Sequence, residues 1–332
     1  MEIASYLKLM AKKKASDLFI SADARVNIKV DGVSLPIGDT ALQGKQVRDM
    51  AYALMDSDQI REFETNWESN LSLTLPGIGR FRVNIFRQRG SVAMVIRYIK
   101  DQIPSIEELN LPLILKELIT EPRGLILVVG ATGSGKSTTL AAMIDHRSKH
   151  TPGHILTIED PIEYIYQHRR AVVNQREVGT DTKSYANALK SAMREAPDVI
   201  MIGEVRDADT MQHALAYSET GHLCLSTLHA NNANQAIERI INFFPDTAHR
   251  QLLADLSLNL RAVISMRLLQ DTESGRVPAV EVMLLSRYVS ELIRKGEIRG
   301  LKEAIAQSEV HGMQTFDQSL YELYQSGRIG LD

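Results

Sequence analysis

A glycine-rich loop between an apolar strand and a helix constrains this chain more than any other feature. Residues 130–137 read GATGSGKS and follow the apolar run LILVV. This matches the P-loop pattern G-x-x-x-x-G-K-S in the strand–loop–helix context that the motif requires. The glycines let backbone N–H groups turn toward a phosphate chain, and the start of the following helix adds a favourable dipole. The sequence therefore predicts an α/β domain that binds phosphate.

The loop also assigns the chemistry of individual side chains. We expect the ammonium of Lys136 to contact the β- and γ-phosphates, and the hydroxyl of Ser137 to coordinate Mg²⁺. The loop residues expected to bind the nucleotide are Gly130, Ala131, Thr132, Gly133, Ser134, Gly135, Lys136, Ser137 and Thr138.

The region after Gly124 alternates short apolar runs with helical patterns. The runs LILVVG, HILTIED, DVIMIGE and HLCLSTLH are rich in Val, Ile and Leu, as is typical of a parallel sheet buried on both faces. From Asn234 onward the pattern predicts helices through QAIERIINFF, RQLLADLSLNLRAVIS and VSELIRKGEIRGLKEAIAQS.

The first 99 residues have a different pattern, in which short strands dominate. We expect two helices there, in IASYLKLMAKK and KQVRDMAYALM, and a hairpin turn at Asp31-Gly32. Residues 100–112, KDQIPSIEELNLP, contain two prolines and four charges and are interpreted as a linker. The predicted organisation is thus residues 1–99, a linker at 100–112, and residues 113–332.

Composition excludes several classes of protein. The single cysteine, Cys224, rules out a disulfide framework or a four-cysteine zinc site within one chain, and we expect it to be a buried strand thiol. No run of eighteen apolar residues exists, and no signal-peptide layout is present, so we expect a cytoplasmic protein without a membrane span. The net charge of −3 provides no global field for nucleic-acid binding.

Acidic residues follow two of the predicted buried strands. Glu204, after DVIMIG, lies where an acid can hold a metal ion directly or through water. Glu159, Asp160 and Glu163 cluster after another strand, and such clustering requires a cation or a polar role to offset repulsion. Glu163 is a candidate general base for the attacking water. A solvated acidic loop is the alternative.

Two histidines, His222 and His229, flank the run LCLSTL. Seven residues apart on a helix they would share a face, but on a strand they do not, so a zinc pair is rejected. We expect them to be hydrogen-bonding sensors of the γ-phosphate, with structural histidines as the alternative.

Arginines alternate with apolar residues in the first domain. Arg82 lies on the strand face opposite Phe81 and Val83, and Arg97 lies opposite Ile96. From the pattern alone, a solvated polar face is the simpler interpretation.

Taken together, the motifs resemble those of the type II/IV secretion ATPases. GATGSGKSTT, ILTIEDPIE, NQREVG, DVIMIGEVRD and TGHLCLSTLHANNA occur in that family's order, and SDLFIS, GRFRVNIFRQRG and GMQTFDQSL are similar to its type IV pilus retraction branch, the PilT/PilU group. The resemblance covers nearly the whole chain. It implies a PAS-like N-terminal α+β domain, a RecA-like ATPase domain, a hexameric ring, and ATP bound between the two domains.

The resemblance also implies roles for the candidate residues. Gly130–Ser137 becomes the Walker A loop, Glu204 the Walker B acid, and Glu163 the catalytic glutamate of the Asp box. His222 and His229 become the His box. Arg82 and Arg97 match the N-terminal arginines placed over the triphosphate, which reverses the interpretation as a solvated face. The expected metal ligands are Ser137, Glu204, Glu159 and Asp160.

Two departures narrow the assignment within the family. The chain lacks the four-cysteine zinc motif and the extra domain of the assembly and secretion ATPases. Retraction motors carry an AIRNLIRE-like segment, whereas this chain has YVSELIRK at 288–295, where only Leu292, Ile293 and Arg294 agree. This favours the accessory, PilU-like group, although a solvated helix with freely varying polar positions would look the same.

The resemblance therefore predicts a Mg²⁺-dependent ATPase that powers or assists type IV pilus retraction and twitching motility. Its implied partners are five further copies, a PilT-type paralogue and an inner-membrane platform protein, with the ring peripheral to that membrane. Two alternatives remain: a secretion or conjugation ATPase that moves protein or DNA, and a non-catalytic scaffold on a partner ring.

Overall fold

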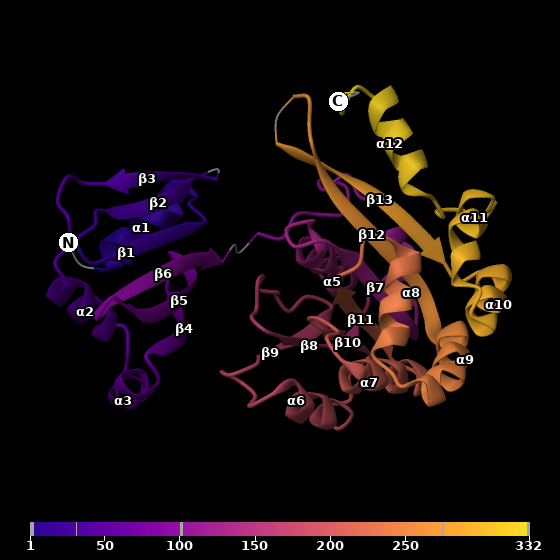
Figure 1. The fold of residues 1–332 in the computed structure, drawn as a ribbon, viewed down its shortest axis with the longest axis horizontal. Coiled ribbons are helices and arrows are strands. Elements are labelled where there is room, and N and C mark those ends of the chain that lie inside the picture. The colour runs from indigo at the N-terminus through magenta and orange to yellow at the C-terminus, as the bar shows by residue number, and fades with distance from the viewer. Residues whose placement is uncertain (1–2, 31, 100–101, 274, 331–332) are drawn as a thin grey trace. The chain divides into compact units, whose positions relative to one another are not determined.

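The computed structural model describes residues 3–30, 32–99, 102–273 and 275–330. The chain forms two compact units. The first comprises Met1–Gln102 together with Glu163–Ile165, and the second comprises Ile103–Ile162 and Tyr166–Asp332. Figure 1 shows the elements of both units along the chain.

The first unit contains one antiparallel sheet of six strands in the order β3-β2-β1-β6-β5-β4. Its elements are α1 (Ile3–Lys13), β1 (Asp17–Ser21), β2 (Val26–Val30), β3 (Val33–Ile37), α2 (Gly44–Tyr52), α3 (Ser57–Asn66), β4 (Glu68–Leu75), β5 (Gly79–Gln88) and β6 (Ser91–Ile99). Val30 pairs with Val33, as the hairpin prediction requires, while Asp31 lies outside the described residues.

Strict alternation along β5 gives this sheet one apolar face. Phe81, Val83 and Ile85 are fully buried and share a hydrophobic cluster with residues of the three helices. The predicted α+β character of this domain is therefore confirmed. Helix α3 was not predicted, because only Phe63 of its residues is buried. Its signal was the capping box, in which the Asp56 carboxylate accepts bonds from the N–H groups of Asp58 and Gln59.

The second unit contains a sheet of seven strands in the order β13-β12-β7-β11-β10-β8-β9. All neighbours are parallel except β12 and β13. The strands are β7 (Gly124–Gly130), β8 (Gly153–Glu159), β9 (Ala171–Glu177), β10 (Val199–Ile202), β11 (Leu223–Leu228), β12 (Leu260–Gln270) and β13 (Arg276–Leu284). The helices are α4 (Ile114–Leu118), α5 (Lys136–His150), α6 (Tyr185–Ala192), α7 (Ala208–Glu219), α8 (Ala233–Asn242), α9 (His249–Asn259), α10 (Arg287–Lys295), α11 (Leu301–Ala306) and α12 (Phe316–Gln325), with short 3-10 turns at Asp246–Ala248 and Ile298–Gly300.

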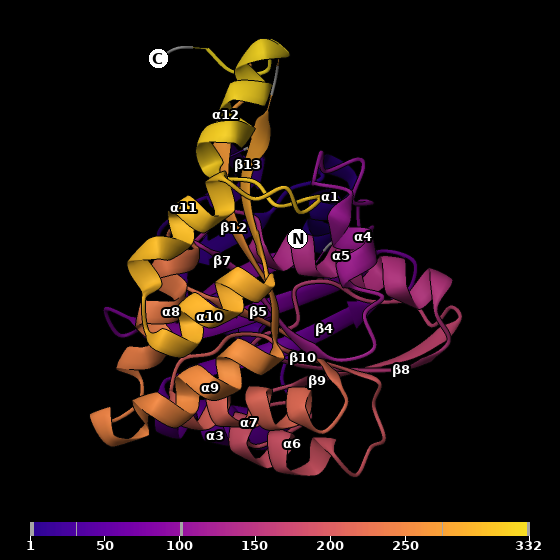
Figure 2. The same ribbon diagram turned by 90° about the vertical axis from the view of Figure 1, so that its right-hand side faces the viewer.

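The four predicted apolar runs form the centre of this sheet as β7, β8, β10 and β11. Every residue of β7, β10 and β11 is buried, because helices cover both faces. Helices α6 to α11 contribute to one large hydrophobic cluster with the sheet, while α5 packs against β7, β9 and β11. Figures 1 and 2 show α8, α9, α10 and α11 grouped together beside β12. Cys224 is fully buried within β11, as expected, and burial raises the pKa of its thiol.

The helical prediction after Asn234 is wrong for two segments. Helix α9 ends at Asn259, and the next eleven residues form β12, with β13 as its antiparallel partner. The run LRAVIS is apolar enough to continue an amphipathic helix. Its β-branched Val263 and Ile264 instead fill the space beside β7. None of the helices in the described part of the chain has the length and apolarity that a membrane crossing needs.

Candidate functional site

The carboxyl edge of the parallel sheet gathers most of the predicted site residues. The P-loop follows β7, His229 follows β11, Glu204 follows β10 and Asp160 follows β8. In the strand order, β11 lies between β7 and β10, and β8 lies beside β10. His229 therefore lies between the P-loop strand and the strand that carries Glu204. The carboxyl edge is where open α/β sheets bind ligands.

Close packing explains the first glycine of the P-loop. A Cβ atom on Gly130 would lie 2.4 Å from the Ser134 Oγ and 2.7 Å from the carbonyl oxygen of Met266. The loop then turns through left-handed backbone at Gly133 and Gly135, with φ angles of 77° and 95°, before α5 begins at Lys136. The Ser134 hydroxyl is buried, and no hydrogen-bond partner for it occurs among the described residues.

Lys136 is bent back over the loop that it follows. Its Nζ donates to the carbonyl oxygens of Gly130 at 2.9 Å and Ala131 at 3.0 Å. The side chain is largely buried, since the residue is only 8% exposed. A buried ammonium is costly unless anions or hydrogen bonds compensate it. Its position at the start of α5 therefore fits an anionic ligand such as a phosphate group.

Glu204 is held through both carboxylate oxygens. The Nε2 of His229 lies 3.1 Å from its Oε1, and the Nε of Arg206 donates to its Oε2 at 2.9 Å. Arg206 also reaches Asp160, with 3.6 Å between Nη1 and Oδ2. The bond to Glu204 raises the pKa of the Arg206 guanidinium. This role of Arg206 was not predicted from the sequence. Its position two residues after Glu204 could have indicated that it contacts the carboxylate.

A half-buried tyrosine, Tyr185, lies in the field of the same acids. Burial, and next the charge of Asp160, raises the pKa of the Tyr185 phenol well above its usual range. The hydroxyl therefore stays protonated at any physiological pH. Its oxygen would lie 2.9 Å from a Cβ on Gly203, so this glycine gives the phenol room beside the acids.

Glu159 is buried and turned toward the neighbouring strand. Its Oε1 accepts bonds from the Thr157 hydroxyl at 2.6 Å and from the Gln175 amide at 3.2 Å. No group of three or more His, Cys, Asp or Glu residues able to hold a metal ion occurs in the described ranges. Mg²⁺ in nucleotide enzymes takes one or two protein ligands and shares its other positions with phosphates and water.

The two histidines do not lie together. His222 precedes β11, and its carbonyl accepts the N–H of Gly124 at the start of β7. Its Nδ1 lies 3.1 Å from the Thr220 hydroxyl. A strand of six residues separates it from His229 by about 20 Å. Within one chain only His229 shares the edge of the P-loop, which also removes any basis for a zinc pair.

Glu163 is exposed and lies in a short segment outside the second unit. Residues Glu163–Ile165 are grouped with the first unit, and the preceding Ile162 is fixed by a bond from its N–H to the Glu177 carboxylate at 3.0 Å. Its catalytic role therefore stays a prediction.

Arg82 and Arg97 are direct cross-strand partners on β5 and β6. Directly opposed residues project from the same face, which here is opposite the buried Phe81. The Nε of Arg97 lies 2.9 Å from the Oδ1 of Asp17, the residue next in register on β1. The predicted arginine pair thus shares one sheet face, and the structure adds Asp17, which sequence reasoning did not single out.

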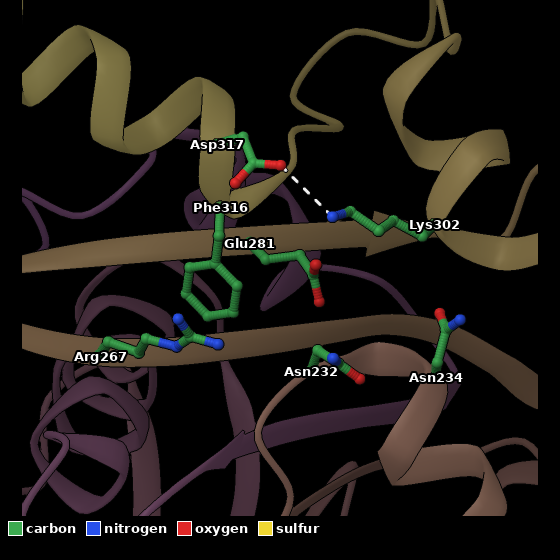
Figure 3. Close-up of a pocket in the computed structure, with 7 residues that line it drawn as sticks. All are labelled: Asn232, Asn234, Arg267, Glu281, Lys302, Phe316 and Asp317. Atoms are coloured by element: carbon green, nitrogen blue, oxygen red, sulfur yellow. Dashed lines mark ion pairs between the residues drawn. The ribbon is translucent and has the colours of Figure 1, made fainter.

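A separate pocket of about 250 Å³ lies between the last helices and the sheet (Figure 3). It is lined by Asn232, Asn234, Arg267, Glu281, Lys302, Phe316 and Asp317. Lys302 pairs with Asp317 at 3.3 Å, and the Arg267 guanidinium lies 4.3 Å from the centre of the Phe316 ring. Glu281 accepts the N–H of Ala233 and the hydroxyl of Ser265.

These contacts hold the last helices against the sheet, so the pocket has a structural role. Its charged groups are compensated from within, and no residue of the P-loop lines it. The segment GMQTFDQSL, which contains Phe316 and Asp317, therefore anchors α12 to β12 and α11.

Comparison with known proteins places the chain among molecular motors. The family model for the type II/IV secretion system protein matches residues 2–323. The type IV pilus ATPase PilU of Pseudomonas aeruginosa is 53% identical over 330 residues, which cover 99% of this chain and 86% of that protein. The type IV pilus retraction ATPase PilT of the same organism is 42% identical, with 99% and 96% covered.

A solved structure agrees with these sequences. The crystal structure of the pilus retraction motor PilT with bound ADP superposes with a TM-score of 0.94 at 41% identity, covering 100% of this chain and 95% of that one. This confirms the predicted fold, a PAS-like domain followed by a RecA-like P-loop domain. By sequence and by fold, the chain belongs to the type II/IV secretion system protein family and, within it, to the PilT/PilU group.

Proposed function

We propose that this protein is an ATPase that powers or assists the retraction of type IV pili, and hence twitching motility. The observation that carries the proposal is the shared carboxyl edge on which the P-loop, His229 and the doubly held Glu204 meet. The relatives named for pilus retraction support the mechanical output. The secretion or conjugation alternative has no comparable support.

The residues present fit ATP with Mg²⁺. The backbone cradle at Gly130 leaves no room for a side chain, and Lys136 provides a buried cation beside it. Ser137, at the start of α5, and Glu204 offer the oxygen ligands that Mg²⁺ prefers. When bound, the ion would neutralise charge on the β- and γ-phosphates. In this proposal Glu159 and Asp160 are the other ligands of the Mg²⁺ ion. Thr138 is the last residue of the loop that binds the nucleotide.

Water attack requires a base, and Glu163 is the residue we propose for it. Arg82 and Arg97 would stabilise charge that develops on the triphosphate, because a basic pair on one sheet face provides preorganised donors. His229 would sense the γ-phosphate through its contact with Glu204. His222, at the opposite end of β11, is not proposed as a ligand of the nucleotide within its own chain.

The proposed working assembly is a homohexamer in the cytoplasm, bound peripherally to the inner membrane through a platform protein at the pilus base. We further propose a PilT-type paralogue as partner. Neither nucleic acid nor a membrane-spanning segment of its own enters this proposal. The mass of the particle in solution, measured with and without ATP, tests the hexamer.

The segment YVSELIRK bears on whether the ring works alone. It forms α10, in which Val289, Leu292 and Ile293 are buried against α9. Two of the three positions that agree with the retraction motors are therefore core positions. Tyr288, which differs, is 61% exposed. A changed surface over a retained core is also what freely varying polar positions would give, so support for the accessory, PilU-like role comes from the 53% identity with PilU against 42% with PilT.

Two measurements test this function. ATP hydrolysis by the purified chain must disappear in the Lys136→Ala variant, because the buried ammonium at the phosphate site is removed. Pilus retraction must then be compared in cells with the Lys136→Ala chain, with no chain, and with or without the PilT-type paralogue. Retraction that is lost in the absence of the paralogue supports the accessory role, and retraction unaffected by its absence contradicts it. Retraction that survives Lys136→Ala but not deletion supports the scaffold instead.

A further inference from the structure

A second pocket, of about 460 Å³, lies entirely within the first unit. It forms where the start of α2 meets the turn between β5 and β6 and the end of α3. Its polar lining includes Lys45, Arg48, Tyr52, Glu64, Arg87 and Ser91. The volume is within the range of small-molecule sites. No part of the proposed ATPase function uses these residues.

A fixed guanidinium forms one wall of the pocket. Arg87 pairs with one oxygen of Glu64, and the other oxygen accepts the hydroxyl of Tyr52. The guanidinium also lies 5.9 Å from the centre of the Phe63 ring. The single carboxylate in the lining is thus already engaged twice. Arg87 is held in place while its remaining N–H groups can serve a ligand.

Two further cations lie along the adjacent face of α2. Lys45 and Arg48 are three residues apart, so they project from the same side of the helix. Among the described residues, no carboxylate lies within ion-pair distance of Lys45, and Arg48 reaches only its neighbour Asp49, at 3.7 Å. The first turn of α2 contains no acidic residue, although an acid there would stabilise the helix. Arg48 thus has one acidic neighbour, whereas the positive charge of Lys45 at this helix start has no matching carboxylate among the described residues.

Close packing brings the helix start next to the turn. A Cβ atom on Gly44 would lie 3.4 Å from the Ser91 Oγ. Glycine therefore keeps the hydroxyl close to the first N–H groups of α2, which can themselves donate to an anion. The pocket in Figure 3 differs, because its cations are matched from within by Asp317 and Phe316.

We propose that this pocket of the first unit binds a small phosphate-bearing anion through Lys45, Arg48, Arg87 and the hydroxyl of Ser91. A guanidinium offers paired N–H groups that match phosphate oxygens, and an ammonium adds a mobile point charge. The three cations meet two carboxylates, Glu64 and Asp49, so the site keeps a net positive charge that favours an anion such as a pyrophosphate group. Lys45, Arg48 and Arg87 are all exposed, so the pyrophosphate and vesicle arms of the test below separate a free anion from a lipid headgroup.

Lysine footprinting with inorganic pyrophosphate tests the site in the full chain. Acylation of Lys45 should fall several-fold as pyrophosphate saturates, while Lys12 and Lys13, exposed at the end of α1, should react as before. The P-loop also binds phosphates, so the measurement is repeated in the Lys136→Ala chain, where protection of Lys45 must persist. Unchanged Lys45 reactivity, or protection that disappears with Lys136, would overturn the proposal.

Calorimetry with pyrophosphate provides the second arm, in the Lys136→Ala background. The double change Lys45→Gln and Arg48→Gln should weaken binding about tenfold or more, because it removes two charged donors, and hydrogen bonds from charged groups are stronger than those between neutral groups. The double change Lys12→Gln and Lys13→Gln removes the same charge elsewhere and should leave the affinity unaltered. If the two double variants lose affinity equally, the anion is attracted by the overall charge of the chain, and the proposed site is contradicted. Vesicles of phosphatidylglycerol that bind the chain through Lys45 and Arg48, without any binding of pyrophosphate, would contradict it as well.

Discussion

The Nε2 of His229 lies 3.1 Å from the Oε1 of Glu204, and this contact joins the ends of two neighbouring parallel strands. Because β11 lies between β10 and the P-loop strand, His229 lies between the phosphate loop and the Glu204 carboxylate that it contacts. The other oxygen of the same carboxylate is held by Arg206. Glu204 therefore responds to two groups at once.

Replacing Glu204 by Gln should separate nucleotide binding from hydrolysis. The amide keeps the shape of the side chain but loses the charge that would hold the metal ion and pair with His229 and Arg206. We expect ATP to bind with little change and turnover to fall by about 100-fold, the usual effect of losing one preorganised electrostatic contact. Steady-state hydrolysis and binding of a fluorescent ATP analogue, measured together, check this. Turnover near the wild-type rate would show that Glu204 has no role in hydrolysis.

Arg206 should act as a positioning residue rather than as a ligand of ATP. Arg206→Gln removes the bond to Glu204 and the contact with Asp160, so kcat should fall about tenfold while KM changes little. Arg206→Lys should restore part of kcat, because an ammonium can still reach Glu204.

The matched control for Arg206 is Arg250→Gln, on an exposed position of α9, which should leave both constants unchanged. A rise in KM without a fall in kcat would instead assign Arg206 to substrate binding.

Sequence patterns predicted those parts of the site that are local. The P-loop, the buried strands and the acids after them each depend on a few neighbouring residues. Strand order is not local, so nothing in the spacing of His222 and His229 reveals that the P-loop strand runs beside β11 and leaves only His229 on its edge. The contact of Arg206 with Asp160 depends on the pairing of β10 with β8 in the same way.

The missed elements have a related cause. The apolar run from Leu260 fits a helix or a strand equally well in isolation. It forms a strand because it pairs with the edge of β7 that β11 leaves free. Helix α3 buries a single residue, so hydrophobic periodicity did not reveal it, and only its cap residues could have identified it.

Gly130→Ala should abolish nucleotide binding through packing alone. The new methyl group would meet the Ser134 hydroxyl and the Met266 carbonyl, which forces the phosphate loop to shift at a cost of about 1–3 kcal/mol. Gly312→Ala is the matched control, because its methyl group would lie 2.7 Å from Ile114 side-chain atoms, outside the loop. Both variants should unfold at lower temperature, but only Gly130→Ala should lose binding of the fluorescent ATP analogue. Equal binding by the two variants would contradict the cradle.

An ion pair between Arg328 and Asp271 holds the segment after α12, and its contribution to stability depends on pH. Arg328 donates through Nε to the Oδ2 of Asp271 at 2.9 Å, and this bond holds the pKa of Asp271 below its usual range. Since the folded-state pKa is the lower one, the unfolded chain binds the extra proton, and the contribution to stability is present above the unfolded value of about 4. It is lost as the pH falls through the folded-state pKa.

The Arg328→Gln variant should therefore unfold more easily than the wild type at pH 7, and the difference between the two should shrink below about pH 4. Urea unfolding of both chains at a series of pH values measures this difference. Lys295→Gln, which breaks the exposed pair with Glu291 on α10, is the control and should give a much smaller difference at pH 7, because both side chains of that pair are about half exposed and water screens them. A difference between wild type and Arg328→Gln that stays constant down to pH 3 would contradict the proposed linkage, because below about pH 4 the unfolded chain takes up a proton at Asp271 before the folded chain does.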